Sequence, residues 1–269
     1  MIGKRKDKMH PQPPQSTPEV ADFFKRWLSI KIDNVDNHIL LICTENNGSI
    51  GELIDELREI MRGHYVAPEI TSKRIAELGA PETAKLLREH LPTTKEARSG
   101  DFGEFLATEL AECWLGFSVP IRRLRWKDGR NMALRGDDIV AIAKDRGGRL
   151  RFLKGESKSR AKLTSTAVKE AAVALDRDHG RPTRYSVLFV AERLREMEKH
   201  ELANDLEKAV LQGFNANSIE HLLFITSGNN PDSYLSNHLR ECKNKMRRHA
   251  VGVHIINHSK FVKRLFSEL

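Results

Sequence analysis

The segment RGDDIVAIAKDRGGRLRFLKGESKSR, residues 135–160, contains two apolar runs separated by a turn that includes two glycines. Such a pattern predicts an antiparallel hairpin, with strands over residues 138–143 and 149–158. In this hairpin the start of the first strand lies opposite the end of the second strand. We therefore expect the carboxylates of Asp138 and Glu156 to lie close together.

The carboxylates and the lysine of this hairpin form a candidate active site. Side chains alternate along a strand, so Glu156 and Lys158 should share one face while Ser157 points to the other. Two carboxylates at one junction form a hard oxygen site suited to Mg²⁺ or Mn²⁺, and Lys158 would orient a bound water. Asp137 and Asp138 are neighbours with opposite directions, and we favour Asp138 because it directly precedes the apolar run.

Two further residues near these strands have a functional and a structural interpretation. Glu104 lies near the start of a helix expected over residues 101–115, where it could reach toward the metal or favour the N-terminal helix dipole. Gly155 would let a phosphate backbone approach closely, or it could mark a bulge or a packing gap. The sequence leaves these alternatives open.

The rest of the chain alternates between predicted helices and strands. Helices are expected over residues 17–30, 49–62, 164–176, 191–212 and 232–248, and strands over residues 38–45, 118–126, 185–191, 220–227 and 250–257. This alternation predicts an α/β fold with a mixed central sheet flanked by helices.

The composition changes along the chain and suggests three parts. Residues 1–18 are basic and rich in Pro and Gln, and we expect a disordered tail. The polar segment PTTKEARSG, residues 92–100, carries turn residues and marks the predicted main boundary. Residues 19–95 would then form an α-rich N-terminal extension with a strand, and residues 96–269 a core with a C-terminal α/β elaboration.

Charge and cysteine content narrow the functional class. The chain has 45 Lys and Arg against 37 Asp and Glu, a formal net charge of +8 that favours binding to polyanions. The three cysteines are far apart and form no CxxC pair, which indicates a reducing, cytoplasmic compartment. No run approaches the ~20 apolar residues of a membrane span, and no Walker lysine loop occurs, so any ATP-dependent step would belong to a partner.

The order of these motifs resembles the PD-(D/E)xK, or restriction-endonuclease-like, superfamily. The motifs of that superfamily have counterparts here in the same order along the chain: FGE ending at Glu104, GDD ending at Asp138 and GESK ending at Lys158. The resemblance implies a core of this type and metal-dependent DNA cleavage. Asp138, Glu156 and the backbone carbonyl of Ser157 would hold the metal, Lys158 would position water, and Glu104 would support catalysis.

A longer match points to a particular family. Three segments within residues 95–190 resemble the HamA family of effector nucleases from the bacterial Hachiman anti-phage defence system. Their sequences are SGDFGEFLATEL, RGDDIVAIAKD and LKGESKSR. This resemblance implies a superfamily 2 helicase partner, HamB-like, that restrains the nuclease until DNA is sensed.

We therefore expect a Mg²⁺-dependent DNA endonuclease of an anti-phage system. Two alternatives stay open. The chain could be a non-catalytic DNA-binding regulatory subunit of a helicase complex, with DNA affinity indifferent to Mg²⁺. It could also be a structure-selective junction nuclease, because one core serves many nucleases and the fold does not fix the substrate.

Overall fold

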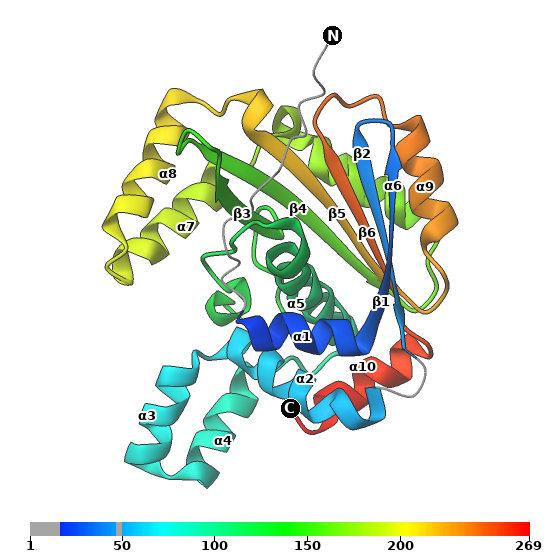
Figure 1. Ribbon diagram of the computed structural model, residues 1–269. Helices are drawn as coiled ribbons and strands as arrows, with labels where there is room; N and C mark the ends of the chain where they lie inside the picture. Colours follow the sequence, from blue (N-terminus) through cyan, green and yellow to red (C-terminus); the bar gives the residue numbers. More distant parts are fainter. Residues whose placement is uncertain (1–16, 47–49) are drawn as a thin grey trace.

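In the computed structural model, which describes residues 17–46 and 50–269, six strands form one mixed sheet (Figure 1). The strands are β1 (Leu28–Val35), β2 (His38–Glu45), β3 (Ile139–Lys144), β4 (Leu150–Arg160), β5 (Ile219–Ser227) and β6 (Arg248–His254). Their spatial order is β1-β2-β6-β5-β4-β3, with four parallel central strands and an antiparallel strand at each edge. Residues 1–16 of the predicted tail lie outside the described residues.

Helices cover both faces of this sheet, as the mixed α/β prediction expects. The α-helices are α1 (Pro18–Trp27), α2 (Ile50–Tyr65), α3 (Pro68–Leu78), α4 (Ala80–His90), α5 (Lys95–Leu115), α6 (Ser165–Asp176), α7 (Arg184–Glu196), α8 (His200–Gln212), α9 (Asp232–Glu241) and α10 (His258–Ser267). Short 3₁₀ turns are η1 (Arg123–Trp126), η2 (Arg177–Gly180) and η3 (Ala216–Ser218). None of the described helices combines the length and apolar character that a membrane span requires.

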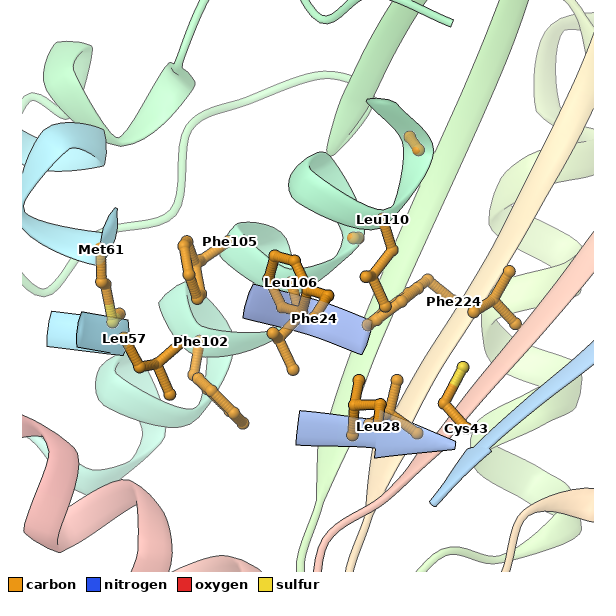
Figure 2. Close-up of a cluster of buried hydrophobic side chains, with 14 of the residues drawn as sticks. Phe24, Leu28, Cys43, Leu57, Met61, Phe102, Phe105, Leu106, Leu110 and Phe224 are labelled. Atoms are coloured by element: carbon orange, nitrogen blue, oxygen red, sulfur yellow. The ribbon is translucent and has the colours of Figure 1, made fainter. Parts of the chain in front are cut away.

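The apolar core is divided by the sheet. On one face, α1, α2, α5 and α10 pack together against the strands, and Figure 2 shows part of this cluster, including Phe24, Phe102, Leu106 and Phe224. On the other face, α6 and α9 cover the central strands, while α7 and α8 cover the β3–β4 hairpin. The long helix α5 is buried along most of its length and therefore has a fixed position over β4.

The hairpin predicted from the sequence is confirmed. β3 and β4 pair antiparallel, with Ile139 opposite Gly155. The turn is closed by Asp145, whose Oδ1 accepts the backbone N–H of Gly147 at 2.8 Å and of Arg149 at 2.9 Å. This register places the residue before β3 opposite the residue that follows Gly155 on β4.

Residues 185–191 correct one prediction, because they are helical and not a strand. They belong to α7, whose first turn is capped by Thr183: its hydroxyl oxygen accepts the backbone N–H of Ser186 at 3.2 Å. Val187 and Val190 are buried at helical spacing against the hairpin. A short apolar run fits either a buried strand or a buried helix face, and here the cap and the packing select the helix.

Two predicted helices are shorter than expected. The helix expected over residues 191–212 is two helices, α7 and α8, separated near Glu198, which has a φ of +61°. The helix expected over residues 232–248 ends at Glu241, and the following strand already begins at Arg248.

The strand expected over residues 118–126 does not form. Ser118 makes an isolated antiparallel bridge to Ile142, and the segment then turns into η1. Pro120 lacks the N–H that a continued ladder would need, so pairing stops after one bridge.

The N-terminal part of the chain shares the central sheet. The helix expected over residues 17–30 ends earlier, because β1 begins at Leu28, and β2 pairs in parallel with β6. The predicted extension, residues 19–95, therefore supplies two strands to the sheet that also holds the hairpin. The predicted boundary segment, residues 92–100, becomes helical at Lys95, where α5 starts.

Gly155 has a packing role in the hairpin. A Cβ at this position would lie 2.8 Å from the Cβ of its cross-strand partner Ile139, a separation that side chains do not tolerate. Of the two interpretations of Gly155, the structure supports close packing. The absent side chain allows the register that joins the two halves of the candidate site.

The substitution Gly155→Ala should lower the free energy of unfolding by about 1–3 kcal/mol, because overpacking forces the two strands to shift. Gly63→Ala is the matched control: Gly63 lies in α2, and a methyl group at this position would meet open space. Alanine there should be neutral or add about 0.5–1 kcal/mol. Urea unfolding followed by circular dichroism measures both changes. A Gly155→Ala protein as stable as the wild type would contradict the packing role.

Candidate active site

The side chains predicted to form the site do converge at the junction of β3 and β4. The backbone N–H of Ser157 donates to Asp138 Oδ2 at 2.9 Å, and Lys158 Nζ lies 2.5 Å from Glu156 Oε1. Asp138, Glu156 and Lys158 are all half-buried. The structure thus brings the carboxylates of Asp138 and Glu156 and the amine of Lys158 together where the start of β3 lies beside β4.

Alternation along β4 separates the polar side chains as expected. Ser157 is buried toward α5, whereas Glu156 and Lys158 are half-buried and form an ion pair. In a strand, the N–H and the C=O of one residue point the same way. The carbonyl of Ser157 therefore faces the same strand edge as its N–H, which is the edge occupied by Asp138.

The two adjacent aspartates have different environments. Asp137 is buried, and its Oδ2 accepts the backbone N–H of Thr183 at 2.7 Å and the Thr183 hydroxyl at 3.1 Å. Its Oδ1 lies 3.6 Å from Lys154 Nζ. Asp137 thus fixes the start of α7 on the hairpin, while Asp138 alone of the pair is hydrogen-bonded to the ExK strand.

Close packing of α5 on β4 positions Glu104. A Cβ at Gly103 would lie 3.3 Å from Ser157 Oγ and 3.2 Å from Ser159 Cβ, so a side chain at 103 would have to displace the strand or the helix. Glu104, the next residue, is half-buried and close enough to Asp138 for the negative charge of Asp138 to raise the pKa of Glu104.

Other acidic residues of α5 have structural partners instead. Asp101 accepts from Lys127 Nζ at 2.8 Å and from the Tyr65 hydroxyl at 2.8 Å. Glu109, which the sequence places on the same helix, lies with its carboxylate against His64 Nε2 at 2.5 Å. These buried contacts hold the helix in place, and Glu104 is the carboxylate of α5 whose pKa is raised by Asp138.

The site is electrostatically strained by its own carboxylates. Burial, together with the negative charge of Glu156, raises the pKa of Asp138 to about 6, against the opposing effect of the Ser157 N–H. Burial, together with Asp138, raises the pKa of Glu104 to about 8. Like charges in a poorly solvated place disfavour ionisation, and a bound cation would remove this penalty.

Arg123 is a functional candidate that the sequence did not single out. It belongs to η1, is half-buried, and its positive charge lowers the pKa of both Glu104 and Asp138. The sequence RRLRW at residues 122–126 is basic, but this pattern does not indicate which arginine acts on the carboxylates. That choice depends on the path of the segment after Pro120.

The donor set fits a hard divalent cation. Asp138, Glu156 and the Ser157 carbonyl supply oxygen atoms, and Mg²⁺ commonly uses one or two carboxylates and completes its shell with waters and substrate phosphates. Among the residues described, no three His, Cys, Asp or Glu side chains gather as a metal site. The protein would therefore offer only part of a coordination shell, which is the arrangement that a substrate phosphate can complete.

Glu104→Gln should raise the free energy of unfolding by several kcal/mol, up to about 5, at pH 8.5 in EDTA, because one pKa unit corresponds to about 1.4 kcal/mol, and should leave it unchanged near pH 4. A free glutamate ionises near pH ~4.3, whereas the pKa of folded Glu104 is about 8. The folded protein is stabilised by the protonated form of Glu104, and this contribution to the free energy of unfolding is fully present below pH ~4.3 and lost as the pH rises through 8. Glutamine cannot ionise, so the Glu104→Gln protein does not lose this contribution.

Urea unfolding at a series of pH values tests this expectation, with Glu170→Gln on the exposed side of α6 as the control. The control should follow the wild-type curve throughout. A Glu104→Gln curve parallel to that of the wild type would show that Glu104 ionises normally.

Comparison with known proteins extends the resemblance seen in the motifs. A search of curated proteins gives no match. The family model of HamA matches residues 21–269, which covers nearly the whole chain, including β1, β2 and the C-terminal elements. The match thus includes the segments before residue 95 and after residue 190, in which no motif was identified. The chain belongs to the HamA family of Hachiman-associated defence proteins.

Proposed function

We propose that this chain is a metal-dependent deoxyribonuclease that hydrolyses phosphodiester bonds as the effector of its defence system. The observation that carries the proposal is the convergence of Asp138, Glu156 and Lys158 at one strand edge. The hairpin register and the close approach of α5 both serve this arrangement. Family membership agrees with a role in defence.

The residues have distinct roles in this proposal. Asp138, Glu156 and the Ser157 carbonyl would hold Mg²⁺ or Mn²⁺, which when bound polarises a phosphate and lowers the pKa of a water. Lys158 positions the attacking water and offsets negative charge at the scissile phosphate. In the metal-free protein Glu104 keeps its proton at neutral pH, because its pKa is about 8, and a protonated carboxyl can donate a hydrogen bond.

The order of elements supports a restriction-endonuclease-like core. A helix bearing Glu104 precedes the hairpin, the Asp138 and ExK motifs lie on its two strands, and α6 follows. One departure is the missing strand at residues 118–126, where a bridge and η1 stand instead. The proposed core therefore has a shortened first strand.

DNA and a helicase are the proposed partners. The net charge of +8 favours a polyanionic substrate. A superfamily 2 helicase, HamB-like, would restrain the nuclease until foreign or damaged DNA is sensed, as family membership suggests. Such a helicase would also supply the ATP-dependent step for which this chain has no Walker motif.

Glu156→Gln and Lys158→Ala should each reduce DNA cleavage in Mg²⁺ by about 10²-fold or more, because each removes a group from the site itself. Lys144→Ala is the matched control, since Lys144 is an exposed lysine at the opposite end of the same hairpin. Cleavage of supercoiled and linear DNA is measured with Mg²⁺ and with EDTA, with and without the helicase. Circular dichroism checks that each variant is folded.

Loss of cleavage in EDTA and in both site variants, with normal cleavage by Lys144→Ala, would support the nuclease. Full activity in both site variants would refute the assigned site. Absence of cleavage under every condition, combined with DNA binding that ignores Mg²⁺, would instead support the non-catalytic subunit. Preference for four-way junctions over linear DNA would favour a junction nuclease.

A further inference from the structure

A basic groove of about 460 Å³ lies beyond the end of β4, between the first turns of α5 and α10. Its cationic lining consists of Lys95 and Arg98 from α5 and Lys260 and Lys263 from α10. No Asp or Glu occurs among the described residues that line it. The groove is therefore a concentrated region of positive charge.

These cations are available for a ligand. Lys95, Lys260 and Lys263 are exposed, and within residues 17–46 and 50–269 no ion pair involves any of the four groove cations. Arg98 donates its Nε–H to the carbonyl of Pro92 at 3.0 Å, which fixes the guanidinium group at the groove wall. Four cations without carboxylate partners should attract an anion strongly.

Neutral groups of the groove also suit an anion. Ser99 Oγ lies 2.8 Å from Ser159 Oγ, which in turn lies 2.9 Å from His258 Nε2. Burial lowers the pKa of His258 to about 4, so its ring is neutral at physiological pH. His258 also starts α10, where Asn257 makes no side-chain cap; its carbonyl oxygen accepts the backbone N–H of Lys260 at 2.8 Å, which leaves the first two N–H groups of the helix, those of His258 and Ser259, to meet an anion.

The groove and the candidate active site share two elements, with the groove on the face of β4 that carries Ser159 and packs on α5, and Glu156 and Lys158 directed to the other face. β4 carries Lys158 and leads three residues later to Ala161 in the groove wall, a separation of roughly 10 Å at strand spacing. α5 carries Glu104 as well as Lys95 and Arg98.

We propose that this groove binds the phosphate backbone of the DNA strand that extends from the active site. The inference rests on the proposed nuclease function. The lining favours backbone contacts over base recognition, because its described members include no Phe, Tyr or Trp to stack on bases and the ring of His258 is buried. Binding here should be independent of sequence and sensitive to salt.

The double substitution Lys260→Gln/Lys263→Gln tests the proposal. Fluorescence anisotropy measures binding of labelled single-stranded DNA of mixed sequence in EDTA, over a series of salt concentrations. Each lost phosphate contact lowers the slope of log K against log salt by about 0.7 for a single strand. We expect the slope to fall by about 1.4 and the affinity to fall about tenfold.

The control is Lys199→Gln/Lys208→Gln, which removes the same charge from exposed positions at α8, far from α10 in Figure 1. It should leave the slope close to the wild-type value. Equal effects of the two double variants would overturn the proposal, as would a wild-type protein that does not bind DNA in EDTA.

Cleavage is measured separately, so that the two hypotheses can fail independently. If the slope of log K against log salt falls only in the groove variant, and no cleavage occurs under any condition, the groove is supported and the nuclease is refuted. Normal metal-dependent cleavage, with a groove variant that binds DNA like the control, would refute the groove alone.

Discussion

The burial of carboxylates beside other negative charges is the constraint that the packing around this site must satisfy. Burial, and then the negative charge of Glu156, raises the pKa of Asp138, while burial and the charge of Asp138 raise the pKa of Glu104. A folded chain holds such groups together only if the surrounding packing outweighs the repulsion. The hydrogen bond from Ser157 and the ion pair with Lys158 offset part of it.

Two glycines make the necessary packing available. Gly155 lets β3 and β4 pair in the register that sets Asp138 beside Glu156, and Gly103 lets α5 settle on β4. Both glycines act by leaving out a side chain where two backbones meet, and neither has a positive φ. The position of the site is thus determined by how closely its elements approach one another.

The sequence predicts the hairpin and its site well, because both depend on local patterns. Alternation, turn chemistry and the ExK spacing correctly indicated that Asp138, Glu156 and Lys158 would meet. The preference for Asp138 over Asp137 also agrees with their placement, since Asp137 holds the start of α7. The catalytic roles of these residues stay predictions.

What could not be predicted depends on tertiary packing. The apolar run at residues 185–191 fits a strand or a helix equally well until Thr183 and the face of the hairpin are considered. The pairing of β2 with β6 joins segments about two hundred positions apart, and no local pattern reports it. Arg123 lowers the pKa of Glu104 and of Asp138 from η1, the turn that follows the point where the chain leaves the sheet after Pro120.

Helix α5 acts as a fixed spacer in the molecule. It is a 21-residue helix, with Lys95 and Arg98 of the groove in its first turn and Glu104 further along. At a rise of about 1.5 Å per residue, the nine positions from Lys95 to Glu104 span roughly 14 Å. Because α5 is buried along most of its length, the fold holds this distance constant. One inserted residue between Arg98 and Glu104 would turn the groove cations by about 100° around the helix axis relative to Glu104, so the two regions are coupled through the length of a single helix.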